Sequence, residues 1–111
     1  MSTLSILWTN SDPIMFDKMV SMYAKNSKIN HWWDNVTVII WGSTAGLAVA
    51  SELVRNDIKE LIHVGVKVSA CKACSDSLGT TESLLGMGVE VKYWGEGLTK
   101  ILKDDEKLLT I

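Results

Sequence analysis

The sequence predicts an α/β fold, a three-layer α/β/α sandwich with a five-stranded, mostly parallel sheet. Short apolar runs alternate strictly with helix-forming segments along the chain. One of these runs, Val36–Trp41, consists almost entirely of β-branched residues, which indicates a strand buried on both faces. The length of 111 residues allows one domain, 1–111, and is too short for a closed eight-stranded barrel.

The first half of the chain contains two predicted strands with their helices. Pro13 lies in the first turn of the first helix, whose apolar residues at helical spacing predict one buried face. Gly65 is expected to cap the helix before the third strand. The expected elements are strand Ser5–Trp8, helix Pro13–Asn26 with buried Met15, Phe16, Met19, Val20, Met22 and Tyr23, strand Val36–Trp41, a helical turn Thr44–Ala50 and helix Leu53–Val64.

The second half continues the alternation with three further strands. Asp76–Met87 is expected to be helical with an interruption around Gly79, and Gly88 to cap it. Asp12 and Asp76 are expected in first-turn or capping positions, where a carboxylate complements the helix dipole. The remaining elements are strands Val66–Ala70, Val89–Tyr93 and Leu108–Ile111, with a short helix Leu98–Lys103 before the last strand.

Charge and targeting signals restrict the function classes. The formal net charge of -2 provides no field that collects phosphates, so we expect no direct nucleic-acid binding. The N-terminus has no basic segment before its short apolar run, so neither a signal peptide nor a membrane span is expected. We therefore predict a cytoplasmic protein. The five tryptophans favour a homo-oligomer, and Trp32-Trp33 is a candidate contact or a satellite of the core.

Ligands of open parallel sheets bind beyond the carboxyl ends of the strands. Three tryptophans and a cysteine are expected at that edge, with small polar residues beside them. This arrangement predicts a partly dehydrated, aromatic-walled pocket around a thiol, although each tryptophan alone could equally cap the core. The predicted pocket residues are Trp8, Asn10, Trp41, Gly42, Ser43, Lys72, Trp94 and Gly95, around Cys71.

Cys71 and Cys74 are the candidate reactive residues. A thiol at a helix start, beside Lys72 and the backbone N–H groups of Ala73 and Cys74, gains thiolate character. The alternatives are an inert buried cysteine and a dithiol redox pair. A zinc site is not expected, because only His31 and His63 could complete it and neither has the required spacing. No nucleotide-binding or hydrolase motif is present, and we predict no cofactor.

The segment Val66–Leu78, VKVSACKACSDSL, together with Gly79, Gly88–Lys92 and Trp94-Gly95-Glu96, resembles the DsrE family over essentially the whole chain. The resemblance implies a five-stranded α/β fold, frequent oligomers and sulfur relay, in which a cysteine receives sulfane sulfur as a persulfide and passes it on. The residue matching that cysteine is Cys71, eight residues before Gly79. Cys74 is an additional thiol that the pattern does not require.

The predicted function is therefore a persulfide carrier. Cys71 would accept sulfane sulfur from a donor protein for delivery to an acceptor protein, and Cys74 could release the sulfur by forming a disulfide. The alternative is a non-catalytic α/β module, which either binds a small ligand in the aromatic pocket or serves as a structural homo-oligomer.

Overall fold

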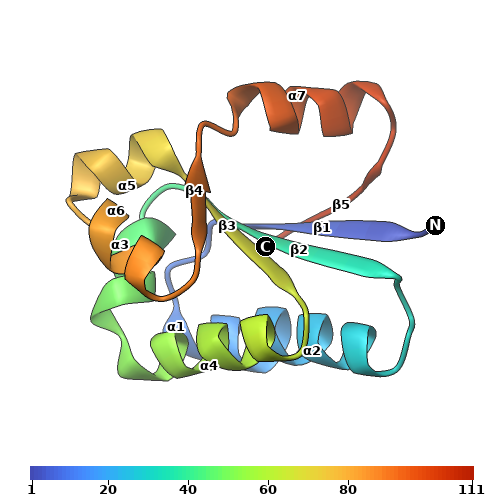
Figure 1. The fold of residues 1–111 in the computed structure, drawn as a ribbon, viewed down its shortest axis with the longest axis horizontal. Coiled ribbons are helices and arrows are strands. Elements are labelled where there is room, and N and C mark those ends of the chain that lie inside the picture. Colours follow the sequence, from blue (N-terminus) through green and yellow to red (C-terminus); the bar gives the residue numbers. More distant parts are fainter.

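The computed structural model describes all 111 residues and contains one five-stranded sheet with helices on both faces (Figure 1). All strand pairings are parallel, and the strand order is β4-β3-β2-β1-β5. The predicted α/β fold with a five-stranded sheet is confirmed. The strands are β1 (Thr3–Trp8), β2 (Asn35–Ile40), β3 (Lys67–Cys71), β4 (Glu90–Lys92) and β5 (Lys107–Thr110).

The helices alternate with the strands as expected. Gly65, Gly79 and Gly88 all have positive φ at the turns that follow helices, in agreement with their predicted roles. No helix has the length and apolar character to cross a membrane. The helices are α1 (Pro13–Met15), the π-helix η1 (Phe16–Ser21), α2 (Met22–Ile29), α3 (Thr44–Ala50), α4 (Glu52–His63), α5 (Lys72–Leu78), α6 (Thr81–Gly86) and α7 (Gly95–Lys103).

The strand order explains which face each helix covers. From β1 to β4 the chain moves across the sheet in one direction, and right-handed crossovers then place the intervening helices on one face. The last crossover returns from β4 to β5 on the far side of β1, so α7 lies on the opposite face. Figure 1 shows α2 and α4 on one side of the sheet and α7 on the other.

The two faces carry cores of very different size. The face covered by α2 and α4 holds a cluster of 19 buried apolar residues, among them Ile6, Val38 and Ile58. The face covered by α7 holds only four, which are Ile39, Cys71, Trp94 and Ile101. Cys71 is therefore part of the smaller core.

The buried face of the first helical segment differs from the prediction. Phe16, Val20 and Ala24 are fully buried, whereas Met15 and Met22 are 40% and 47% exposed. The prediction is confirmed for Phe16 and Val20 and wrong for Met15 and Met22. The buried face is centred on Phe16, Val20 and Ala24, so the two methionines lie outside it.

The helix after β3 begins earlier than predicted. It starts at Lys72 instead of Asp76 and ends at Gly79, whose φ of 72° is left-handed. Cys74 therefore lies inside the first turn of α5. Asp12 caps α1 as predicted, with its carboxylate accepting the Ile14 N–H, but Asp76 lies within α5 and caps nothing.

Candidate functional site

Cys71 is the last residue of β3 and the N-cap of α5, with an extended backbone (φ -68°, ψ 116°). Its side chain is on the sheet face that α7 covers, packed with Trp94 and Ile101, and the residue is only 5% exposed. It makes no capping hydrogen bond. The expected contacts from the N–H groups of Ala73 and Cys74 are therefore not formed.

Cys74 is the more accessible thiol. It is half-buried and lines a shallow cavity of about 300 Å³ with Gly42, Ser43, Ser77 and Leu78. The Gly42 N–H donates to Cys74 Sγ at 3.2 Å. Burial raises the pKa of the Cys74 thiol, the Gly42 hydrogen bond opposes this, and a hydrogen bond with the Cys71 thiol adds to the rise. The structure thus brings the two thiols and the predicted residues Gly42 and Ser43 together.

The loop after β2 positions the Gly42 N–H. Gly42 has a φ of 76°, a conformation that favours glycine. The buried Thr44 hydroxyl bonds the Trp41 N–H at 3.1 Å, the Trp41 carbonyl at 2.9 Å and the Trp8 carbonyl at 3.0 Å. Thr44 therefore ties the ends of β1 and β2 together. We assigned no role to it from the sequence, because only the paired strands bring its partners within reach.

The thiols lie beside the point where the sheet changes winding direction. The chain leaves β3 toward α5 and leaves the neighbouring β4 toward α7 on the opposite face, an arrangement that opens a crevice in α/β proteins. Here Trp94 occupies that position. Its indole N–H donates to Ser69 Oγ at 2.8 Å, and the Lys92 ammonium lies 4.5 Å from its ring centroid. Trp94 is therefore a cover over Cys71 and not an open pocket wall.

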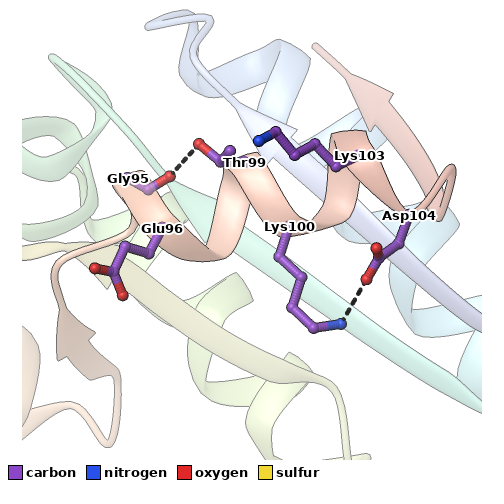
Figure 2. Close-up of a pocket in the computed structure, with 6 residues that line it drawn as sticks. All are labelled: Gly95, Glu96, Thr99, Lys100, Lys103 and Asp104. Atoms are coloured by element: carbon purple, nitrogen blue, oxygen red, sulfur yellow. Dashed lines mark hydrogen bonds and ion pairs between the residues drawn. The ribbon is translucent and has the colours of Figure 1, made fainter.

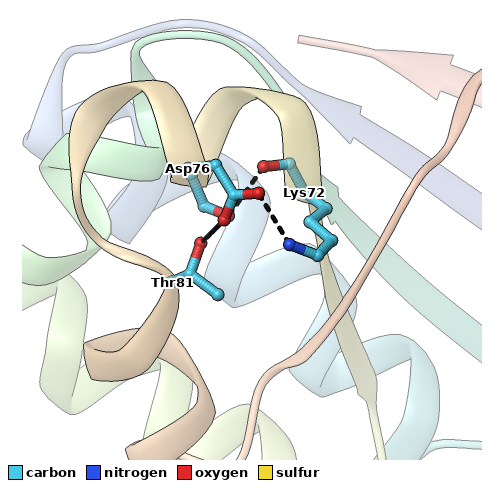
Figure 3. Close-up of polar contacts among 4 residues, drawn as sticks. Lys72, Asp76 and Thr81 are labelled. Atoms are coloured by element: carbon cyan, nitrogen blue, oxygen red, sulfur yellow. Dashed lines mark hydrogen bonds and ion pairs between the residues drawn. The ribbon is translucent and has the colours of Figure 1, made fainter.

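The Lys72 ammonium is paired with a carboxylate and is not free to stabilise a Cys71 thiolate. Its ammonium pairs with Asp76 at 2.6 Å and lies 5.6 Å from the centroid of the Tyr93 ring. Asp76 also accepts a hydrogen bond from Thr81 at 2.5 Å, as Figure 3 shows. The Lys72 hydrogen bond is the main cause of the lowered pKa of Asp76. This network joins α5 to the start of α6 and neutralises the charge that was expected to favour a Cys71 thiolate.

The predicted aromatic-walled pocket is not formed. Trp8 is fully buried, packs against Phe16 with ring centroids 4.1 Å apart, and donates its indole N–H to the Asn10 carbonyl. Trp41 packs partly against the small core. The Asn10 side chain accepts the Asp12 N–H, so it holds a turn instead of facing a ligand. Each tryptophan fills or caps a core, which was the alternative interpretation of the sequence.

A second shallow groove, of about 420 Å³, runs along the exposed side of α7 and is lined by neither cysteine (Figure 2). It is lined by residues of that helix and its end, including the predicted pocket residue Gly95. Thr99 bonds the Gly95 carbonyl at 2.7 Å, and Lys100 pairs with Asp104 at 2.8 Å. These are ordinary contacts of an exposed helix. No group of three or more His, Cys, Asp or Glu side chains is placed to hold a metal ion.

A solved structure matches this architecture along almost the whole chain. It is described as a conserved protein of unknown function, BT1422 from Bacteroides thetaiotaomicron, with 34% sequence identity and a TM-score of 0.97. The match covers 99% of this chain and 95% of that one. The chain belongs to the BT1422 family.

Membership of the BT1422 family supports the α/β fold described above. No family model and no curated protein matches the chain. The DsrE resemblance therefore stays a prediction.

Proposed function

We propose that the protein is a sulfane-sulfur carrier, as the DsrE resemblance implies, and that Cys74 is its accepting thiol. The supporting observation is the position of Cys74, half-buried in an open cavity at the carboxyl edge of the sheet with the Gly42 N–H on its sulfur. Cys71, which the sequence favoured for this role, is enclosed beneath Trp94 and Ile101. A donor can reach Cys74 without moving α7.

The proposed step is a thiol exchange. The Cys74 thiolate attacks the outer sulfur of a donor hydropersulfide, the donor S–S bond breaks, and the donor leaves as a thiolate. The outer sulfur, with its proton, is then bound to Cys74 as a hydropersulfide. The Gly42 N–H supports the negative charge on the attacking sulfur, as donors aimed at a sulfur anion do.

The shape of the cavity favours protein partners over a small free ligand. It is shallow, lies at the small end of the range for ligand sites, and has Leu78 half-exposed at its rim. Such a surface admits the exposed cysteine of another protein and does not enclose a molecule. We therefore propose donor and acceptor proteins as partners, in the cytoplasm, where thiols stay reduced.

Single-cysteine variants test the assignment. Cys71→Ala and Cys74→Ala are reduced, exposed to inorganic polysulfide without oxygen, and analysed by intact mass and peptide mapping. We expect an adduct of about 32 Da on Cys74 in Cys71→Ala and none in Cys74→Ala. Because its pKa is raised, loading of Cys74 should keep increasing with pH beyond the point where an exposed peptide thiol levels off. An adduct confined to Cys71, or no adduct in either variant, contradicts the proposal.

A further inference from the structure

The second cysteine, Cys71, is buried in the core against which the proposed accepting residue, Cys74, packs. Cys71 is the N-cap of α5, and Cys74 lies three residues later in the first turn of that helix. Cys74 packs against the small core that contains Cys71, so the two side chains are in the same apolar contact group. Trp94 and Ile101 are buried in the same core as Cys71. Within this contact group the other thiol is that of Cys74.

The local backbone permits a bond between these sulfurs. Residues three apart in a helical turn are neighbours, and disulfides accept Cα separations of about 4.4–6.8 Å. Cys71 is the N-cap and has an extended backbone, so its side chain is not fixed by helical φ and ψ. A disulfide here closes one turn and needs no rearrangement of the sheet.

We propose that Cys71 resolves the persulfide on Cys74, so that the protein releases sulfide from sulfane sulfur; this inference rests on the proposed function. The Cys71 thiolate attacks the inner sulfur, the one bonded to Cβ of Cys74. A Cys71–Cys74 bond forms, the bond to the outer sulfur breaks, and its electron pair leaves with that sulfur as HS⁻. The outer sulfur is reduced to sulfide, and the two cysteines are oxidised to the disulfide.

The step uses no other oxidant, because the sulfane sulfur takes both electrons. The proton lost by Cys71 balances the HS⁻, which leaves as hydrogen sulfide at neutral pH. A small dithiol restores the two thiols for another cycle. Intramolecular attack is favoured by proximity, so the persulfide on Cys74 is short-lived unless an acceptor protein removes the sulfur first.

The test follows the fate of one loaded sulfur. Wild type and Cys71→Ala are loaded with inorganic polysulfide without oxygen, freed of donor by rapid gel filtration, and followed by intact mass and a sulfide assay. We expect wild type to become about 2 Da lighter than the reduced chain and to release about one sulfide per loaded chain. Cys71→Ala should keep its adduct of about 32 Da and release sulfide only after dithiol is added.

The outcomes separate this inference from the proposed function. If neither Cys71→Ala nor Cys71→Ser loads sulfur although both remain folded by circular dichroism, the carrier function fails and the inference fails with it. If the variants load but wild type keeps a stable persulfide on Cys74, the carrier stands and the resolving role of Cys71 is overturned. The control is wild type incubated in the same way without polysulfide. Its two cysteines must stay reduced, because a disulfide in that sample would come from another oxidant.

Discussion

Trp94 is held over β3 by one hydrogen bond and by a close contact with its own helix. A Cβ built at Gly97 would lie 2.8 Å from Cε3 of the Trp94 ring, nearer than real Cβ atoms approach. Gly97 is therefore required by the ring and not by its backbone conformation. The same ring covers Cys71, so this contact determines how tightly the buried thiol is enclosed.

We expect Gly97→Ala to lower the free energy of unfolding by about 1–3 kcal/mol, because the ring must leave its position over β3. Gly95→Ala is the matched control in the same helix, since no atom lies within 4 Å of its added Cβ. Urea unfolding of both variants checks the prediction. Alkylation of Cys71 should also be faster in Gly97→Ala, and equal stability of the two variants would contradict the proposed contact.

Thr44 acts at the junction of two strands and a helix. Thr44→Val keeps the shape of the side chain but leaves its backbone partners at Trp8 and Trp41 without the hydroxyl. We expect a loss of about 1–3 kcal/mol in the free energy of unfolding, measured by thermal or urea denaturation. Thr44→Ser keeps the hydroxyl and should recover most of the stability. A Thr44→Val protein as stable as wild type would contradict the role of the hydroxyl.

The contact between η1 and α4 contains a pair of carboxyl groups. Asp57 of α4 is buried, and its pKa is raised to about 7 by burial, by a hydrogen bond with Asp17 of η1, and by the charges of Asp17 and Glu60. Lys25 of α2 opposes this rise. The hydrogen bond with Asp57 lowers the pKa of Asp17, and Lys18 beside it acts in the same direction. Asp57 therefore keeps its proton to a higher pH than Asp17 does.

This pair predicts how stability changes with pH. Between about 4 and 7 the native Asp57 keeps a proton that the unfolded chain has lost, so stability falls as pH rises through this window. The Asn side chain of Asp57→Asn can still donate a hydrogen bond to Asp17. The stability of this variant should be nearly independent of pH over the same range, and its free energy of unfolding at pH 8 should exceed that of wild type by on the order of 1–3 kcal/mol. Unfolding midpoints measured from pH 4 to 8 check the prediction. Parallel pH profiles for both proteins would contradict it.

The strands and most helix boundaries could be predicted from the sequence, because apolar runs and turn glycines are local signals. The π-helical turn of η1 and the early start of α5 could not, since no residue marks either one. The candidate site was predicted in part. Cys71, Cys74, Gly42 and Ser43 do lie at one edge of the sheet, but Cys71 is buried by residues of α7 and Trp94, which strand order places there and sequence periodicity does not report. The pairing of Lys72 with Asp76 follows from the early start of α5, which puts the two residues four apart in one helix.

At the scale of the whole molecule, the sequence predicts a homo-oligomer. Trp32 is 58% exposed, with its ring centroid 6.1 Å from that of Tyr23, while Trp33 is half-buried and donates to the Tyr23 hydroxyl at 3.2 Å. Trp32 is therefore the better candidate for the contact predicted from the sequence. We expect light scattering to give a mass above that of one chain, and Trp32→Ser to reduce it. A wild-type mass of one chain at all concentrations would contradict the homo-oligomer.

The sheet is bounded by two short strands, β4 and β5. The three residues of β4 alternate Glu90 and Lys92 with a single apolar Val91, and Glu90 pairs with both Lys67 and Lys92. Charged, brief edges discourage strand addition by a neighbouring chain. Addition of a neighbouring chain along β4 is thus discouraged, and association beside this edge is left to helices and loops, the same surfaces that carry the accessible thiol.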